Sequence, residues 1–174
     1  MATSILIPVE EYLRTTYRPD CEYVNGRLVE RHVGEYRHSF LQGLLIALLS
    51  ARARERRFRV FPEQRVQISA KPRYRIPDIC VKALPHSITS ILLEPDLVIE
   101  ILSPDDQPAE ILVKVGDYLQ AGVPHVWIVD PYKATLVVAG LEGIRDVPER
   151  VAESGLVGPV DFNELLAQLD EPAD

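Results

Sequence analysis

Cysteine is scarce in this 174-residue sequence: Cys21 and Cys80 are the only two, and they form neither a C-x-x-C pair nor any metal-ligand spacing. The pattern therefore predicts no disulfide framework and no cysteine zinc site, and we expect a reducing cytoplasm. A chain of this length buries about 70% of the surface that its unfolded form exposes, so it needs no disulfide or structural metal to be stable. We expect a single domain over residues 1–174.

Long hydrophobic runs are also missing. The longest, residues 40–51, contains Gln42 and Gly43 and is too short to span a bilayer. The first residues, MATSILIPVEEYL, lack the basic region of a signal peptide. The sequence contains no G-x-G-x-x-G, P-loop, G-x-S-x-G or H-E-x-x-H motif. We therefore expect no membrane partner and none of the enzyme classes that these motifs mark.

Hydrophobic periodicity alternates between helix and strand along the chain. The apolar stripe of one long helix consists of Leu41, Leu44, Leu45, Leu48 and Leu49. Asn25-Gly26 predicts a β-hairpin, because both residues tolerate positive φ. Helices are expected over 8–14, 37–57, 108–121 and from Asp161 onwards, and strands over 21–24, 28–31, 60–68, 79–81, 97–102, 126–129 and 135–138. The predicted fold class is α/β, with a mixed central β-sheet flanked by helices. An exposed strand edge or the 135–138 hairpin would support a two-fold homodimer.

One charged residue, Glu100, interrupts the otherwise apolar run of residues 97–102. A carboxylate on a strand covered on both faces is costly unless it is paired or bound to a metal. Asp78 follows Pro77 at the start of the preceding core strand, so the two carboxylates can converge on one hard cation. Mg²⁺ suits one or two carboxylates, a backbone carbonyl such as that of Ile101, and several waters. We therefore expect a Mg²⁺ (or Mn²⁺) site at Asp78, Glu100 and Ile101.

Lys114 lies at the edge of the apolar stripe of the next helix, about 100° from the centre of that stripe. Its stem can follow the sheet while its ammonium reaches the strand end that carries Glu100. A cation at that point would orient a water or stabilise a pentacoordinate phosphate. The alternative is a solvated lysine at a helix edge with no role in a site.

These residues and their spacing resemble the PD-(D/E)xK nuclease superfamily, and within it the Uma-type family, which carries the label "putative restriction endonuclease". The resemblance extends over nearly the whole chain. It depends on the order of four stretches: 22–30 (EYVNGRLVE), 75–78 (RIPD), 97–104 (LVIEILSP), and the segment from Lys114 to Pro131 with GVPHVWIVDP. It implies a restriction-endonuclease-like core and a metal-dependent phosphodiesterase site, with Asp78 and Glu100 as Mg²⁺ ligands.

One position departs from the motif that this resemblance implies. The motif lysine should follow the acid by two residues, where this sequence has Leu102. Such families are thought to move the lysine to the following helix, and Lys114 matches that position. Glu22 would be an additional acidic residue from the N-terminal part. The implied function is a metal-dependent endonuclease that hydrolyses phosphodiester bonds in DNA. Catalysis would depend on Lys114 reaching the metal, whereas the fold would not.

Two other functions fit the same residues. Leu102 and the acidic balance agree with a catalytically inactive nuclease-fold module for binding or assembly, and the metal site agrees equally with a hydrolase of a small phosphate ester. Among single residues, Asp78 could cap a turn after Pro77, and Glu100 could pair with an arginine. His38 lies in line with the leucines of the long helix. It is interpreted as a hydrogen-bonded core histidine, with a role at the site as the alternative.

The net charge of −7 is unevenly distributed. Residues 146–174 hold eight acids and one arginine, a net −7, so the rest of the chain is neutral. Residues 52–75 hold nine bases and two acids, a net +7. One interpretation of this basic block is a solvated helix end. The other is a surface for a phosphate backbone, with Arg56, Arg57, Arg73 and Arg75 as contacts. We expect the acidic segment to dock on the block, and its deletion to strengthen DNA binding.

Overall fold

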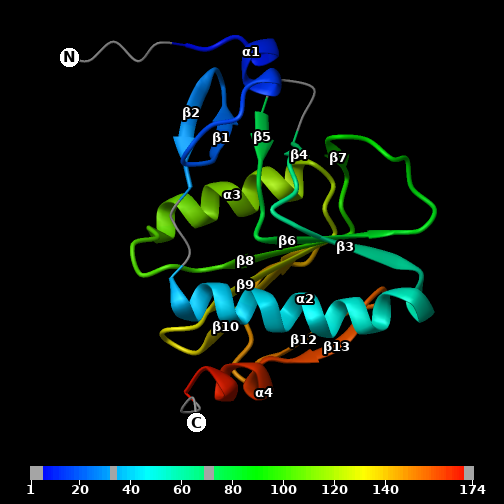
Figure 1. Ribbon diagram of the computed structural model, residues 1–174. Coiled ribbons are helices and arrows are strands. Elements are labelled where there is room, and N and C mark those ends of the chain that lie inside the picture. Colours follow the sequence, from blue (N-terminus) through cyan, green and yellow to red (C-terminus); the bar gives the residue numbers. More distant parts are fainter. Residues whose placement is uncertain (1–5, 32–34, 69–72, 171–174) are drawn as a thin grey trace.

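The computed structural model describes residues 6–31, 35–68 and 73–170, and a six-stranded mixed sheet forms its centre (Figure 1). The strand order is β11 (Gly143–Asp146), β10 (Thr135–Gly140), β9 (His125–Asp130), β8 (Leu97–Ile101), β6 (Ile79–Ala83) and β3 (Phe58–Pro62). β8 and β9 are parallel, whereas the other neighbours are antiparallel. The long helix α2 (Tyr36–Arg56) covers one face and α3 (Pro108–Gln120) covers the other, which confirms the predicted fold class.

The alternation of side chains along β8 divides its residues between two hydrophobic clusters. Leu97, Ile99 and Ile101 pack with the leucine stripe of α2, whereas Val98 packs with α3. Glu100 shares the face of Val98, so its carboxylate points toward α3. The whole strand is buried, as its continuous apolar run predicts. Glu100 is therefore an ionisable carboxyl group enclosed between the sheet and a helix.

A smaller five-stranded sheet lies at one end of the molecule, beside the short helix α1 (Val9–Arg14) (Figure 1). Its order is β2 (Arg27–Glu30), β1 (Cys21–Val24), β5 (Arg73–Arg75), β4 (Val66–Gln67) and β7 (Leu92–Leu93). β1 and β2 form the predicted hairpin, and the turn residues Asn25 and Gly26 have φ angles of 52° and 87°. The single strand expected over 60–68 is wrong. The chain turns at Glu63, whose φ is 48°, and passes from one sheet to the other.

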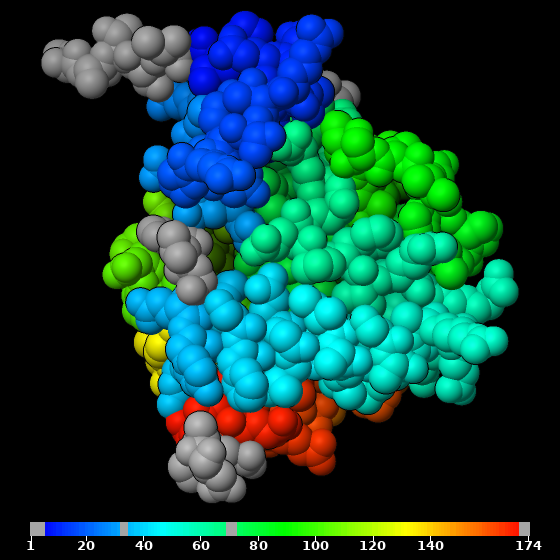
Figure 2. Space-filling view, in the orientation of Figure 1, coloured from blue at the N-terminus to red at the C-terminus, as the bar shows by residue number. Residues whose placement is uncertain are grey.

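Residues 146–170 of the acidic C-terminal segment contribute to the core and are not an appendage. β12 (Val151–Ser154) and β13 (Gly158–Asp161) pair with each other, and α4 (Phe162–Ala167) follows. The side chain of Asp161 accepts a hydrogen bond from the backbone N–H of Asn163 at 2.8 Å and caps α4. Phe162, Leu165 and Leu169 pack with the leucines of α2, and Figure 2 shows the C-terminal residues (red) against that helix (cyan). Deleting 146–174 would open this core, so that deletion cannot test DNA binding.

β11 is an outer strand of the central sheet, and all four of its residues are exposed. β10 lies between β9 and β11, so the 135–138 hairpin has no free edge of its own. Homodimerisation through the edge at β11 stays a prediction. Across the described ranges, no helix is long and apolar enough to cross a membrane.

Candidate active site

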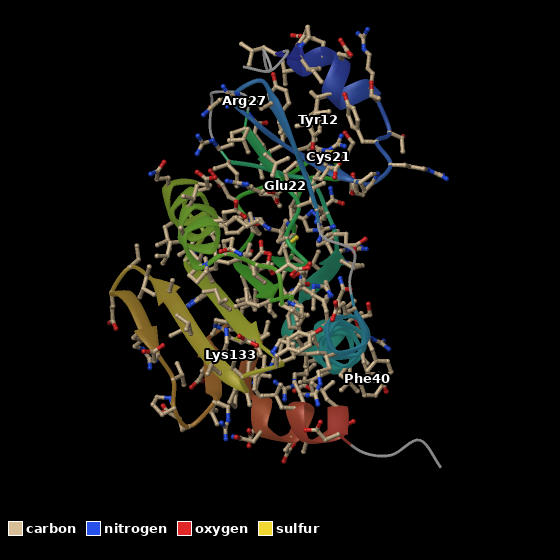
Figure 3. All side chains as sticks on the ribbon, turned by 90° about the vertical axis from the view of Figure 1, so that its left-hand side faces the viewer. Tyr12, Cys21, Glu22, Arg27, Phe40 and Lys133 are labelled. Carbon is tan, nitrogen blue, oxygen red and sulfur yellow. The ribbon has the colours of Figure 1, made fainter. Side chains whose placement is uncertain are left out.

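The predicted acidic residues line one small cleft of about 60 Å³ beside the last residues of β8. The β1–β2 hairpin, the start of α2, the residue before β6 and one face of α3 surround it, and Figure 3 shows Glu22 on the hairpin. The charged or titratable side chains that line the cleft are Glu22, Glu30, Arg31, His38, Asp78, Glu100, Asp106, Glu110 and Lys114. Glu22, Asp78, Glu100 and Lys114 therefore converge from separate parts of the chain.

Asp78 is buried, and both of its carboxylate oxygens have partners. Arg31 donates to Oδ1 at 2.8 Å and the backbone N–H of Ile101 donates to Oδ2 at 2.7 Å, while Nε2 of His38 lies 3.3 Å from Oδ2. Burial raises the pKa of Asp78, but His38, the Ile101 N–H and Arg31 outweigh burial and hold this pKa below its usual range. Asp78 is therefore an anion at neutral pH.

Glu100 is enclosed on the α3 side of β8. Tyr118 donates a 2.5 Å hydrogen bond to Oε1 of Glu100, and Nζ of Lys114 lies 3.6 Å from Oε2. Burial raises the pKa of Glu100 to about 7, and the charges of Asp78 and Glu22 add to this effect, whereas Lys114 and Tyr118 oppose it. A cation in the cleft would favour the ionised carboxylate.

Lys114 reaches the cleft from α3. Its Nζ lies 3.6 Å from Oε2 of Glu100 and 3.8 Å from Oε1 of Glu22. Burial lowers the pKa of Lys114, but the charges of Glu100 and Glu22 outweigh burial and raise this pKa above its ordinary value. The side chain is therefore an ammonium. Leu102, where the resemblance would place the lysine, packs against the apolar cluster on the α3 face. The ammonium at the cleft is that of Lys114, and its role in catalysis stays a prediction.

Glu22 is part of a buried ion-pair network. Its Oε2 accepts from Nη1 of Arg75 at 2.6 Å, and its Oε1 accepts from the backbone N–H of Ile76 at 3.0 Å. Arg75 also donates to Oδ2 of Asp117 at 2.8 Å and 2.6 Å, and Arg73 pairs with the same aspartate. The network joins β1, β5 and α3, and it fixes the carboxylate of Glu22 at the cleft.

Two of the four arginines predicted to contact a phosphate backbone, Arg73 and Arg75, are engaged in ion pairs instead. Arg75 is buried, and both Arg73 and Arg75 are engaged in ion pairs, so neither presents a free guanidinium to a phosphate backbone. Arg56 and Arg57 are exposed at the C-terminal end of α2. The opposite end of this 21-residue helix reaches the cleft, about 30 Å away along the axis. Nucleic-acid binding by Arg56 and Arg57 stays a prediction.

Sequence patterns assigned no role to Glu30, Arg31, Asp106 and Glu110 of the cleft lining or to Tyr118 beside Glu100, and they left the role of His38 open. Tyr118 follows Lys114 by one helical turn, and this spacing was a usable signal that both face Glu100. Arg31 comes from the end of the hairpin, where no periodic pattern marks it. His38 is a core residue that also touches the site: Nε2 faces Asp78, and the buried Nδ1 has no hydrogen-bond partner in the described part of the chain.

The donor set of the cleft fits a hard, hydrated cation. Asp78 and Glu100 offer carboxylate oxygens, and Ile101 lines the same cleft. The volume of the cleft, about 60 Å³, is several times the ~10–15 Å³ that one water molecule needs. Among the residues described, no group of three His, Cys, Asp or Glu is arranged to hold a metal ion. An ion held by Asp78 and Glu100 would have to retain several waters, as Mg²⁺ does in proteins, and Mg²⁺ or Mn²⁺ binding stays a prediction.

The comparisons with known proteins agree with this fold. The model of the Uma2 family, described as "Putative restriction endonuclease", matches residues 9–164. The crystal structure of a "putative nuclease belonging to DUF820" from Anabaena variabilis ATCC 29413 is similar in fold. Its TM-score is 0.81 and its identity 24%, over 94% of this chain and 99% of that chain. The "cryoEM structure DrdV-DNA complex" has a TM-score of 0.42 and 17% identity, over 75% of this chain and 12% of that chain. No curated protein matches the sequence. Since the family model covers most of its length, the chain belongs to the Uma2 family, whose description indicates a nuclease-type function.

Proposed function

We propose that the protein is a metal-dependent endonuclease that hydrolyses phosphodiester bonds in DNA. The observation that carries this proposal is the convergence of Asp78, Glu100 and Lys114 in one cleft, although they are far apart in the sequence. Two buried carboxylates next to an ammonium are costly to assemble without a function for them. Membership of the Uma2 family supports the same reaction class.

The charge of the cleft favours a cation before a nucleic acid. Six acidic side chains line it, against the cations Arg31 and Lys114, so a DNA backbone alone would be repelled. Asp78 and Glu100 would hold Mg²⁺ or Mn²⁺, which supplies Lewis-acid stabilisation and a more acidic water when bound. DNA binding is therefore expected to require the metal.

The other residues of the cleft have supporting roles in this proposal. The ammonium of Lys114 is placed to orient a water or to neutralise charge that develops on a phosphate. Glu22 and Glu100 hold that ammonium from two sides, at 3.8 Å and 3.6 Å. The Ile101 N–H and His38 fix the orientation of Asp78 through its Oδ2. Orientation of this kind limits the motion of a metal ligand.

Cleavage of supercoiled plasmid DNA in the presence of Mg²⁺ or Mn²⁺ tests the proposal. Asp78→Asn is expected to lower the cleavage rate roughly a hundredfold or more. Asp105→Asn is a matched control, because Asp105 is an exposed aspartate outside the cleft lining. Equal cleavage by the wild type and Asp78→Asn would contradict the assignment.

A second candidate, the inactive nuclease-fold module, has one observation in its favour. Both oxygens of Asp78 already have protein partners, so this carboxylate is compensated without a metal ion. Calorimetric titration with MnCl₂ separates the two functions. A catalytic site should bind Mn²⁺ and lose this binding in Glu100→Gln, whereas an inactive module should give no binding heat with either protein.

A further inference from the structure

Arg31 holds the oxygen of Asp78 that a metal ion would need. Its Nη2 donates to Oδ1 of Asp78 at 2.8 Å. The other oxygen, Oδ2, accepts from the Ile101 N–H at 2.7 Å and lies 3.3 Å from His38. A metal ion that binds Asp78 therefore competes with the Arg31 guanidinium for Oδ1.

Two cations cannot both remain close to this oxygen without strong repulsion. The side chains of Arg31 and Asp78 are 14% and 5% exposed, so solvent screens the pair weakly. A guanidinium does not lose its proton in proteins, so Arg31 has to move away when a metal binds. Its second partner, Glu63, is 55% exposed and lies 3.6 Å from Nη1, which makes a weak tether.

We propose that Arg31 is an exchangeable cation: it neutralises Asp78 in the metal-free protein and moves to a phosphate oxygen of DNA when a divalent cation binds Asp78. This inference rests on the proposed function. A guanidinium suits the second position, because its planar fork can donate two parallel hydrogen bonds to a phosphate. Arg31 lines the cleft, so the movement requires a side-chain rotation and no change of fold.

Arg31→Ala and Arg31→Lys separate the two roles. In calorimetric titration with MnCl₂, Arg31→Ala is expected to bind Mn²⁺ about tenfold more tightly than the wild type, because the competing charge is gone. In fluorescence anisotropy with a labelled DNA duplex and Ca²⁺, the same variant is expected to bind about tenfold more weakly. Arg31→Lys keeps the charge but lacks the fork, so it should bind Mn²⁺ as the wild type does and DNA more weakly than the wild type.

Arg27→Ala is the matched control for the loss of one arginine. Arg27 is exposed on β2, the strand that ends one residue before Arg31, and Figure 3 shows it at the far end of the hairpin from Glu22. The Mn²⁺ affinity and the DNA affinity of Arg27→Ala should equal those of the wild type.

If the wild type binds Mn²⁺ and Arg31→Ala binds it no more tightly, the exchange is overturned and the proposed function stands. If neither binds Mn²⁺, both are overturned. Should Arg31→Ala fail to fold, wild-type DNA affinity in Arg31→Lys overturns the exchange.

Discussion

The hydroxyl of Tyr118 donates a 2.5 Å hydrogen bond to Oε1 of Glu100, and both side chains are buried between α3 and the central sheet. The contact gives one oxygen of a buried carboxyl group the hydrogen bond that water would otherwise supply. Lys114 approaches the other oxygen. Helix α3 therefore compensates the buried charge of β8 with two side chains one turn apart, and the position of the helix along the sheet is coupled to the site.

Tyr118→Phe removes the hydroxyl and leaves the ring in place. The free energy of unfolding is expected to fall by about 1–3 kcal/mol, because one oxygen of Glu100 loses its partner in a buried environment. Urea unfolding followed by circular dichroism measures this change. Tyr36→Phe is the control: Tyr36 is 69% exposed, and its change should stay within about 0.5 kcal/mol. Equal stability of Tyr118→Phe and wild type would show that the hydrogen bond contributes nothing.

Arg75 joins two buried carboxylates, Glu22 and Asp117. Arg75→Met keeps most of the side-chain volume but leaves both acids without this partner, so a loss of about 3–5 kcal/mol in unfolding free energy is expected. Arg59→Met, on an exposed position of β3, should change it little. Adding Glu22→Gln and Asp117→Asn to Arg75→Met should recover part of the loss, because the unpaired charges are then gone. A loss below about 1 kcal/mol in the single variant would contradict the role of the network.

The parts of the site that follow local rules could be predicted from the sequence. Glu100 stands out because a charge interrupts a run of apolar residues, and burial of the whole strand follows from that run. The reach of Lys114 follows from its angle to the apolar stripe of its helix, and the structure places its Nζ 3.6 Å from Glu100. Both inferences need only the pattern of apolar residues within one strand or one helix.

The partners of the buried charges could not be predicted in the same way. Arg75 and Asp117 lie 42 positions apart, and they meet only because the fold brings β5 of the smaller sheet next to α3. The three-residue strand β5 is too short to show a period, so the basic residues 73 and 75 were interpreted as a surface. The choice between an ion pair and a DNA contact depends on tertiary packing, which single-element patterns do not contain.

The thiol of Cys80 is fully buried in β6, and burial raises its pKa to about 12. At about pH 8 only ~1 in 10,000 such thiols is a thiolate, so native Cys80 should resist iodoacetamide. Burial and the charges of Glu30 and Asp20 also raise the pKa of Cys21. Mass spectrometry should show no alkylation of the native protein and two modified cysteines in urea. Ser87→Cys, at an exposed position, should gain one modification in the native state. Alkylation of Cys80 in the native protein would contradict the burial of its side chain in β6.

Phe162 connects the C-terminal segment to the core through an edge-to-face contact with Trp127, at 5.9 Å between ring centroids. Phe162→Ala is expected to lower the unfolding free energy by about 3–5 kcal/mol, because a large buried ring is replaced by a cavity. Trp127 is the only tryptophan in the chain, so its fluorescence reports the urea transition of the core directly. Leu141→Ala is the control, since Leu141 is 97% exposed. If Phe162→Ala and the wild type unfold at the same urea concentration, residues 151–170 do not fold cooperatively with the central sheet; a shifted but single transition shows that they do.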